Sequence, residues 1–305
     1  MSKKGSLVYQ ANRQLKDMFA FGESKHQLKI TGGKEAVKEG IFSFNTARTY
    51  IRECSNYFHW LRIYHPEVSD LIEGQAYIRE YLRRIRKKDG TQYAAYSLAT
   101  KAAALAKLYG LRKYQTPKRR RDQITRSRNH TPGAYENNHP ELCLFCDSTG
   151  LRRHEIETLT GDQLRMMEGQ AYIRIRRGQA KGGRPRAVPV IGDQASIIRM
   201  MEQAGAGKVF GRITKDMDIH SHRAAYAAAL YQLRARPLIE CQASPFYDPQ
   251  RRTWCRNSVY SCRKDKAGTW YDKEALLYVS WALGHNRIDV VAEHYLYNLR
   301  SNERS

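Results

Sequence analysis

A basic stretch that contains prolines lies near the middle of the chain and limits what the chain can fold into. Residues 112–132 include a proline followed at once by four basic residues, Pro117, Lys118, Arg119, Arg120 and Arg121. Proline interrupts helices and strands, and a dense run of like charges opposes packing into a core. The 305 residues are also enough for two ordinary domains. We therefore predict two domains, residues 1–111 and 133–305, joined by residues 112–132 as a basic linker.

The first domain is predicted to be a helical unit over residues 41–111, and residues 1–40 leave room for one further helix. Apolar residues recur there at intervals of three and four, which is typical of helices with one buried face. Ser43 or Asn45 can cap the first of these helices. The three stripes are Ala47, Tyr50, Ile51, Cys54, Phe58 and Leu61; Ile78, Leu82 and Ile85; and Leu98, Ala102, Leu105 and Tyr109.

The second domain is predicted to combine helices with a small β-sheet. Ala171, Ile173 and Ile175 alternate with more polar residues, which indicates a strand with one buried face. A second short strand is predicted over residues 187–190, and the residues between the two strands favour a turn that would place Lys181 at the rim of a hairpin. From Ile197 onward the pattern is mostly helical. The fold class is therefore mainly α with a small β-sheet.

The charge of the chain points to a polyanionic partner. Lysine and arginine number 53 against 30 acidic residues, a formal net charge of +23. Such residues gain affinity by displacing counterions from phosphates, although a basic surface can also serve solubility. No apolar run of about 18 residues and no signal-peptide pattern is found. We expect no membrane partner and a cytoplasmic location.

The cysteines leave two interpretations open. Cys143 and Cys146 have the spacing of half a zinc site, but their apolar surroundings favour core packing. Cys241, Cys255 and Cys262 could hold a metal in a zinc-stabilised DNA-binding module. Without other signs of secretion, reduced thiols are expected.

Six polar residues occur in short phrases through the second domain. Arg152 lies in Thr149-Gly150-Leu151-Arg152-Arg153-His154-Glu155, and Lys181 begins Lys181-Gly182-Gly183-Arg184-Pro185-Arg186. The others are His220 and Arg223 in His220-Ser221-His222-Arg223, His285 after Gly284, and Tyr295 between His294 and Leu296. Arginine forks match the oxygens of a phosphodiester, and Glu155, one helical turn beyond Arg152, could hold its guanidinium. Taken in this order, the six residues resemble the catalytic set of the tyrosine recombinase (phage-type integrase) family.

The resemblance implies a role for each residue. Tyr295 would attack the scissile phosphate and form a 3′-phosphotyrosine, while Arg152 and Arg223 clamp the phosphate oxygens. Lys181 would be the general acid for the leaving 5′-oxygen, and His220 and His285 would also contact the phosphate. No metal, ATP or other cofactor is needed in this chemistry, because the covalent bond stores the energy and the arginines supply the charge.

The resemblance also implies an architecture and a partner. Residues 1–111 would be a core-binding (SAM-like) domain and residues 133–305 a catalytic domain, together a C-shaped clamp on DNA. The partner would be double-stranded DNA with inverted-repeat recombination sites, bound by a dimer on one site and a tetramer in synapsis, as in mobile genetic elements. Candidate DNA contacts are Arg83, Arg84, Lys101, Lys118, Arg119, Arg120, Arg184 and Arg186.

The chain departs from the family pattern at several points. His222 replaces the family's usual leucine, and the spacing from His285 to Tyr295 is one residue longer than usual. An apparent insertion near 241–272 is basic and aromatic. Tyr297 competes with Tyr295 as nucleophile, and the helical period favours Tyr295 because it continues the apolar face of Ile288 and Val291. Alternative functions are a type IB topoisomerase-like relaxing enzyme and an inactive DNA-binding regulator on the same scaffold.

Overall fold

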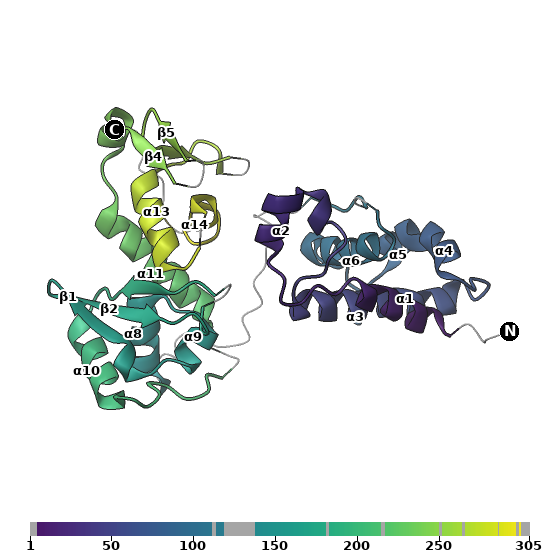
Figure 1. Ribbon diagram of the computed structural model, residues 1–305, viewed down its shortest axis with the longest axis horizontal. Helices are drawn as coiled ribbons and strands as arrows, with labels where there is room; N and C mark the ends of the chain where they lie inside the picture. Colours follow the sequence, from purple (N-terminus) through teal and green to yellow (C-terminus); the bar gives the residue numbers. More distant parts are fainter. Residues whose placement is uncertain are drawn as a thin grey trace. The chain divides into compact units, whose positions relative to one another are not determined.

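The computed structural model describes residues 5–111, 114–118, 138–180, 183–214, 217–249, 252–263, 266–285, 287–296 and 299. The chain forms two compact units, Met1–Ile124 and Thr125–Ser305 (Figure 1). Lys181, Arg119, Arg120 and Tyr297, together with much of the predicted linker, lie outside the described residues. Within the described ranges, no helix has the length and apolar character needed to cross a membrane.

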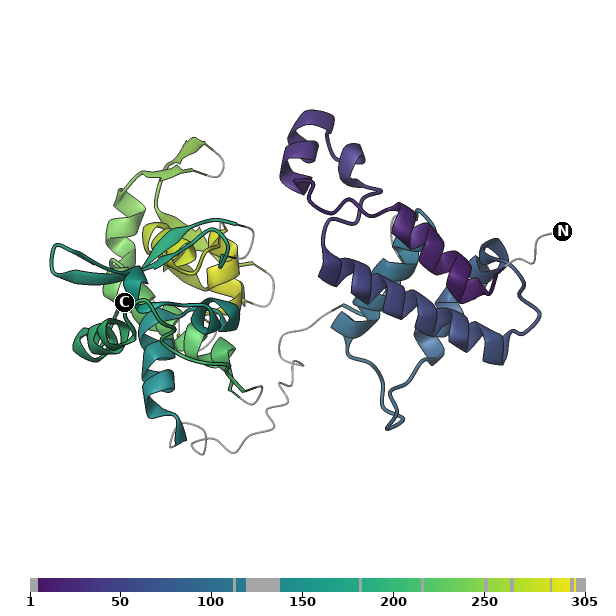
Figure 2. The same ribbon diagram turned by 60° about the horizontal axis from the view of Figure 1, so that its bottom comes forward.

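The first unit is helical and is built around its longest helix (Figure 2). That helix, α3 (Phe44–Tyr64), packs against both α1 (Leu7–Asp17) and α6 (Ala95–Leu108). The remaining elements of this unit are α2 (Lys25–Gly32), η1 (Glu35–Val37), α4 (Leu71–Gly74), η2 (Gln75–Tyr77) and α5 (Ile78–Arg84).

The sequence pattern explains α3. Ser43 is its N-cap, and its hydroxyl accepts a hydrogen bond from the Thr46 amide at 3.2 Å, which confirms one of the two predicted caps. The predicted stripe is buried at Ala47, Cys54, Phe58 and Leu61. Residues 1–40 contribute more than the single helix expected: both α1 and α2 form there, and Ala11 and Leu15 of α1 belong to the core of this unit.

Lys101 was expected on the outer, DNA-facing surface of the first unit, and this is wrong. It is 4% exposed and forms an ion pair with Glu53 at 2.6 Å. Burial alone would raise the pKa of Glu53, but Lys101 and Arg52 outweigh it and hold that pKa below its usual range. Lys101 therefore belongs to a buried ion cluster, whereas Arg83 and Arg84 are exposed.

The second unit contains a three-stranded antiparallel sheet and helices. The strand order is β1 (Leu164–Met167), β2 (Gln170–Ile175) and β3 (Arg186–Pro189). The predicted alternation in β2 is confirmed, since Ala171, Ile173 and Ile175 are all fully buried. The helices are α8 (Pro140–Thr149), α9 (Arg153–Glu157), η3 (Gly161–Gln163), α10 (Gln194–Ala204), α11 (Ile219–Arg234), α12 (Leu238–Ala243), α13 (Lys273–Ala282) and α14 (Ile288–His294).

The expectation of a mostly helical chain after Ile197 is wrong between α12 and α13. Two antiparallel strand pairs form there: β4 (Phe246–Asp248) with β5 (Thr253–Cys255), and β6 (Val259–Ser261) with β7 (Trp270–Asp272). Each strand is three residues long, which is too short to show an alternation in the sequence. Cross-strand pairing of aromatic residues, such as Tyr247 opposite Trp254, stabilises pairs of this length.

Candidate active site

Arg152 is presented by a sharp turn at the end of α8. Gly150 caps that helix in the left-handed region, with φ 56°. A Cβ on Gly150 would lie 2.2 Å from Cδ1 of Tyr226, so the position has room only for glycine. The turn leaves Arg152 as the N-cap residue of α9, with its side chain 20% exposed.

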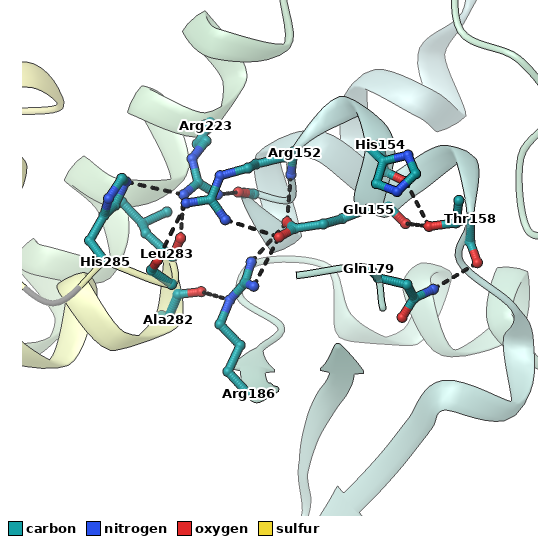
Figure 3. A network of polar contacts seen from close by, with 12 residues as sticks. Arg152, His154, Glu155, Thr158, Gln179, Arg186, Arg223, Ala282, Leu283 and His285 are labelled. Atoms are coloured by element: carbon teal, nitrogen blue, oxygen red, sulfur yellow. Dashed lines mark hydrogen bonds and ion pairs between the residues drawn. The ribbon is translucent and has the colours of Figure 1, made fainter. Parts of the chain in front are cut away.

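Glu155 holds two arginines in place (Figure 3). Its carboxylate is 1% exposed and accepts from Arg152 Nη1 at 2.9 Å and from the Arg152 amide at 2.8 Å. It also accepts two hydrogen bonds from Arg186, at 2.9 and 2.8 Å. Burial alone would raise the pKa of Glu155, but Arg186 and Arg152 outweigh it and hold that pKa below its usual range. Glu155 is therefore a buried carboxylate that orients both guanidinium groups.

Arg186 was expected to contact DNA, and the structure places it elsewhere. Its side chain is 9% exposed, and beyond its two bonds to Glu155 it donates from Nε to the carbonyl of Ala282 at 2.8 Å. It therefore links β3 to Glu155 and to the end of α13. The sequence carries no local sign of this pairing, because Glu155 and Arg186 are 31 residues apart.

Arg223 is the largest fully buried side chain of the described residues, at 1% exposed. It lies on α11 and donates to the carbonyls of Gly150 and Leu283 (Figure 3). The pKa of Arg223 is lowered to about 10, mainly by burial and in part by the neighbouring Arg152, while Tyr295 opposes the shift. The group is still cationic at neutral pH, so a positive charge is held deep in the unit, beside the Tyr295 hydroxyl.

The Tyr295 hydroxyl lies between Arg223 and His285. Arg223 Nε donates to it at 3.2 Å, and His285 Nε2 lies 3.1 Å from it. Arg223 Nη2 is in turn 3.4 Å from His285 Nε2. Arg152 joins the group through its Nη2, which donates to the carbonyl of Gly284 at 3.4 Å. One hydroxyl, one imidazole and two guanidinium groups thus converge from four segments of the chain.

His285 follows the end of a helix. Its amide donates to the carbonyl of Ser280 at 2.7 Å, which closes the last turn after α13. Gly284, with φ 65°, makes the reversal, as glycine commonly does beyond a helix C-terminus. The next helix, α14, begins only at Ile288.

Tyr295 is the residue that ends α14. It is the C-cap of that helix and is half-buried. The apolar face predicted to orient it continues through Val291, which is fully buried. The competing tyrosine, Tyr297, lies outside the described residues.

The remaining predicted site residues are His220 and Lys181. His220 is exposed near the start of α11, three positions before Arg223 and so on the same helical face. His222 instead pairs its Nδ1 with Asp147 at 2.8 Å. Lys181 lies outside the described residues, but Gln179, two positions before it, is anchored by a hydrogen bond from its side chain to the carbonyl of Thr158 at 2.7 Å (Figure 3).

Lys118 and Arg184, both predicted DNA contacts, are exposed.

Cys143 and Cys146 are buried in the core of the second unit, as their apolar surroundings indicated. Over the described part of the chain, no group of three or more histidine, cysteine, aspartate or glutamate side chains is arranged to hold a metal ion. The polar residues that converge are instead donors, which favours an anionic ligand.

Comparison with known proteins supports the fold. No protein-family model and no curated protein matches the sequence. The structure is similar to that of the XerH site-specific recombinase bound to difH substrate in a pre-cleavage complex. The TM-score is 0.50 at 13% sequence identity, and the match covers 94% of this chain and 92% of that chain. The chain therefore has the fold of a site-specific recombinase, largely helical with small antiparallel sheets.

Proposed function

We propose that the protein is a site-specific DNA recombinase that cuts and rejoins DNA strands through a covalent tyrosine–phosphate bond. The observation that carries the proposal is the position of the Tyr295 hydroxyl, 3.2 Å from Arg223 Nε and 3.1 Å from His285 Nε2. A buried guanidinium next to a hydroxyl attracts an anionic substrate to the oxygen that would attack it.

The reaction is an exchange of phosphate esters. The Tyr295 oxygen loses its proton as it attacks phosphorus, the bond to the deoxyribose 5′-oxygen breaks, and that oxygen takes up a proton, so that a 3′-phosphotyrosine and a free 5′-hydroxyl result. Arg223 and Arg152 stabilise the charge that develops on the non-bridging oxygens, and His285 donates to the same group. Lys181 protonates the leaving 5′-oxygen as general acid, with His220 a further phosphate contact. Attack by a 5′-hydroxyl reverses the step, so ATP and metal ions are not required.

The proposed substrate is double-stranded DNA with inverted-repeat sites. The net charge of +23 supports a polyanion. Residues 1–111 serve as a core-binding domain and residues 133–305 as the catalytic domain, and together they clamp the duplex. A dimer occupies one site and a tetramer forms the synapse, because twofold-related half-sites require twofold-related protomers.

A suicide substrate tests the proposal. The DNA flanking the gene supplies candidate inverted repeats, and a nick beside the scissile position traps the covalent product. The wild-type protein is expected to form an adduct that survives denaturing electrophoresis and excess chelator. Tyr295→Phe is expected to form none, while Tyr297→Phe, the matched control, still forms it. An adduct retained in Tyr295→Phe and lost in Tyr297→Phe would overturn the assignment of the nucleophile, and loss on chelation would overturn the metal-free mechanism.

A further inference from the structure

The predicted insertion near 241–272, which lies between α12 and α13 and is called the inserted segment, contacts the helix that ends at Tyr295. Lys266, in the turn between β6 and β7, donates from Nζ to the carbonyl of Ala292 at 2.8 Å and to that of Leu296 at 3.4 Å. Ala292 precedes Tyr295 by three positions and Leu296 follows it directly, so the two carbonyls flank Tyr295 at the end of α14. Tyr271 of β7 donates its hydroxyl to the same Leu296 carbonyl at 3.3 Å.

Backbone geometry explains why Lys266 matters there. The last carbonyls of a helix have no partner within the helix. In a continuing helix the Leu296 amide would bond to the Ala292 carbonyl, but it bonds to Val291 at 3.2 Å, beside the Tyr295 amide at 3.0 Å. The Ala292 carbonyl is thereby left for Lys266. A cation at this end also interacts favourably with the helix dipole.

The turn that carries Lys266 is itself held firmly. The Cys262 amide donates to the Thr269 carbonyl at 2.9 Å, and the Thr269 amide donates to the Lys266 carbonyl at 3.1 Å. Tyr271, 3% exposed, meets the ring of Tyr231 on α11 edge-on, with ring centroids 5.4 Å apart. The inserted segment therefore bridges α11, which carries Arg223, and α14, which carries Tyr295.

We propose that Lys266 is a positioning residue for Tyr295, and that the inserted segment holds the nucleophile in place within the same chain. This inference rests on the proposed function. Lys266 touches no reacting atom; it stabilises the end of α14, and the Tyr295 hydroxyl keeps its distances to Arg223 and His285 as a result. Displacement of a reacting group by about 1 Å can cost roughly a hundredfold in rate.

The test compares Lys266→Met, which keeps most of the side-chain volume, with Lys266→Arg, which keeps the donor. In single-turnover cleavage of the nicked DNA at saturating protein, Lys266→Met is expected to lose roughly 10- to 100-fold in the rate of adduct formation. The DNA dissociation constant is expected to stay within about twofold, since Lys266 is bonded to backbone carbonyls. Lys266→Arg is expected to recover most of the rate, and Tyr271→Phe to show a smaller loss than Lys266→Met.

Lys273→Met is the matched control. Lys273 also binds a backbone carbonyl of the inserted segment, that of Asn257 at 3.1 Å, but it does not hold α14. This variant is expected to cleave at the wild-type rate. A second measurement needs no catalysis: hydrogen exchange of the free protein at residues 291–296 is expected to accelerate in Lys266→Met and not in Lys273→Met.

The outcomes separate this inference from the proposed function. An absence of adduct with wild-type protein defeats the proposed function, whatever exchange shows. A wild-type rate and wild-type exchange in Lys266→Met, with the adduct still dependent on Tyr295, defeats only the positioning role. A parallel loss of DNA affinity assigns Lys266 to DNA contact and overturns it, and equal losses in Lys273→Met overturn it in favour of general destabilisation.

Discussion

Each unit of the protein buries one glutamate that pairs with two cations, and the two clusters differ in how much positive charge remains without a carboxylate partner. In the first unit, Glu53 pairs with Lys101 at 2.6 Å and Arg52 at 2.8 Å. In the second, Glu155 pairs with Arg152 and Arg186, and a third cation, Arg223, lies buried beside them with bonds to carbonyls and to the Tyr295 hydroxyl.

The difference separates a structural cluster from the one that we propose is reactive. Lys101 is neutralised by Glu53 and serves the packing of α3 against α6. Arg223 has carbonyl and hydroxyl partners that carry no full negative charge, so its cluster keeps an excess of positive charge next to Tyr295, the proposed nucleophile. An anionic phosphate would complete it. Buried cations without a matching carboxylate are costly, and such cost is typical of functional sites.

The largest expected effect follows from replacing the guanidinium group of Arg223. Arg223→Lys keeps a cation but loses the fork that reaches Tyr295 and the two carbonyls at once. We expect the rate of adduct formation to fall roughly 10²- to 10³-fold, the usual cost of one transition-state donor. Single-turnover cleavage of nicked DNA measures it. Lys101→Arg is the matched exchange in the other cluster, and a similar loss there would erase the distinction between the two clusters.

Glu155→Gln and Glu53→Gln break the two clusters in parallel. Each removes the carboxylate from a buried cation, Lys101 in the first unit and Arg186 in the second, so each variant should lose about 3 kcal/mol of unfolding free energy in its own unit. Only Glu155→Gln is expected to lower the rate of cleavage as well, because Arg152 loses its orientation. Chemical denaturation and cleavage assays check both. Equal catalytic losses in the two variants would contradict the assignment of the Glu53 cluster to packing.

Acid should weaken both clusters in the same direction. The pKa values of Glu53 and Glu155 are held below their ordinary value of 4.5 in the folded chain. Their contributions to stability are therefore complete above pH 4.5 and are lost as the pH falls from there through the folded pKa values. Melting temperature measured from pH 7 to pH 3 should drop steeply at the acid end. Glu155→Gln should flatten part of that drop, and an unchanged profile would show that Glu155 is not ionised in the fold.

The smallest expected effect concerns DNA binding by the first unit. Arg83 and Arg84 are exposed, whereas Lys101 is committed to Glu53. Removing two phosphate contacts lowers the slope of log affinity against log salt by about 2. We expect a reduction of that order for the double variant Arg83→Gln/Arg84→Gln and no change for Lys101→Met, measured by fluorescence anisotropy. A reduced slope in Lys101→Met would restore the original interpretation of Lys101 as a DNA contact.

The sequence predicted local features well where a single helix or strand determines them. The cap at Ser43, the buried face of α3 and the alternation of β2 follow from the residues themselves. It also predicted that Glu155 would hold Arg152, because three positions along a helix bring side chains together. The short strands of the inserted segment were missed, because their pairing lies in cross-strand contacts rather than in a period along the chain.

What the sequence determined by itself is therefore the identity of the polar residues and the elements that carry them. Which basic residues would face a substrate was decided by the tertiary structure alone. Lys101 and Arg186 have the same local character as exposed basic residues, but packing places a carboxylate from a distant segment against each of them. Burial makes such a pairing necessary, since a cation removed from water without a partner is too costly. The position of Lys266 is also a feature of the tertiary structure. Its hydrogen bonds to the carbonyls of Ala292 and Leu296 depend on where two distant segments meet, and no spacing in the sequence records them.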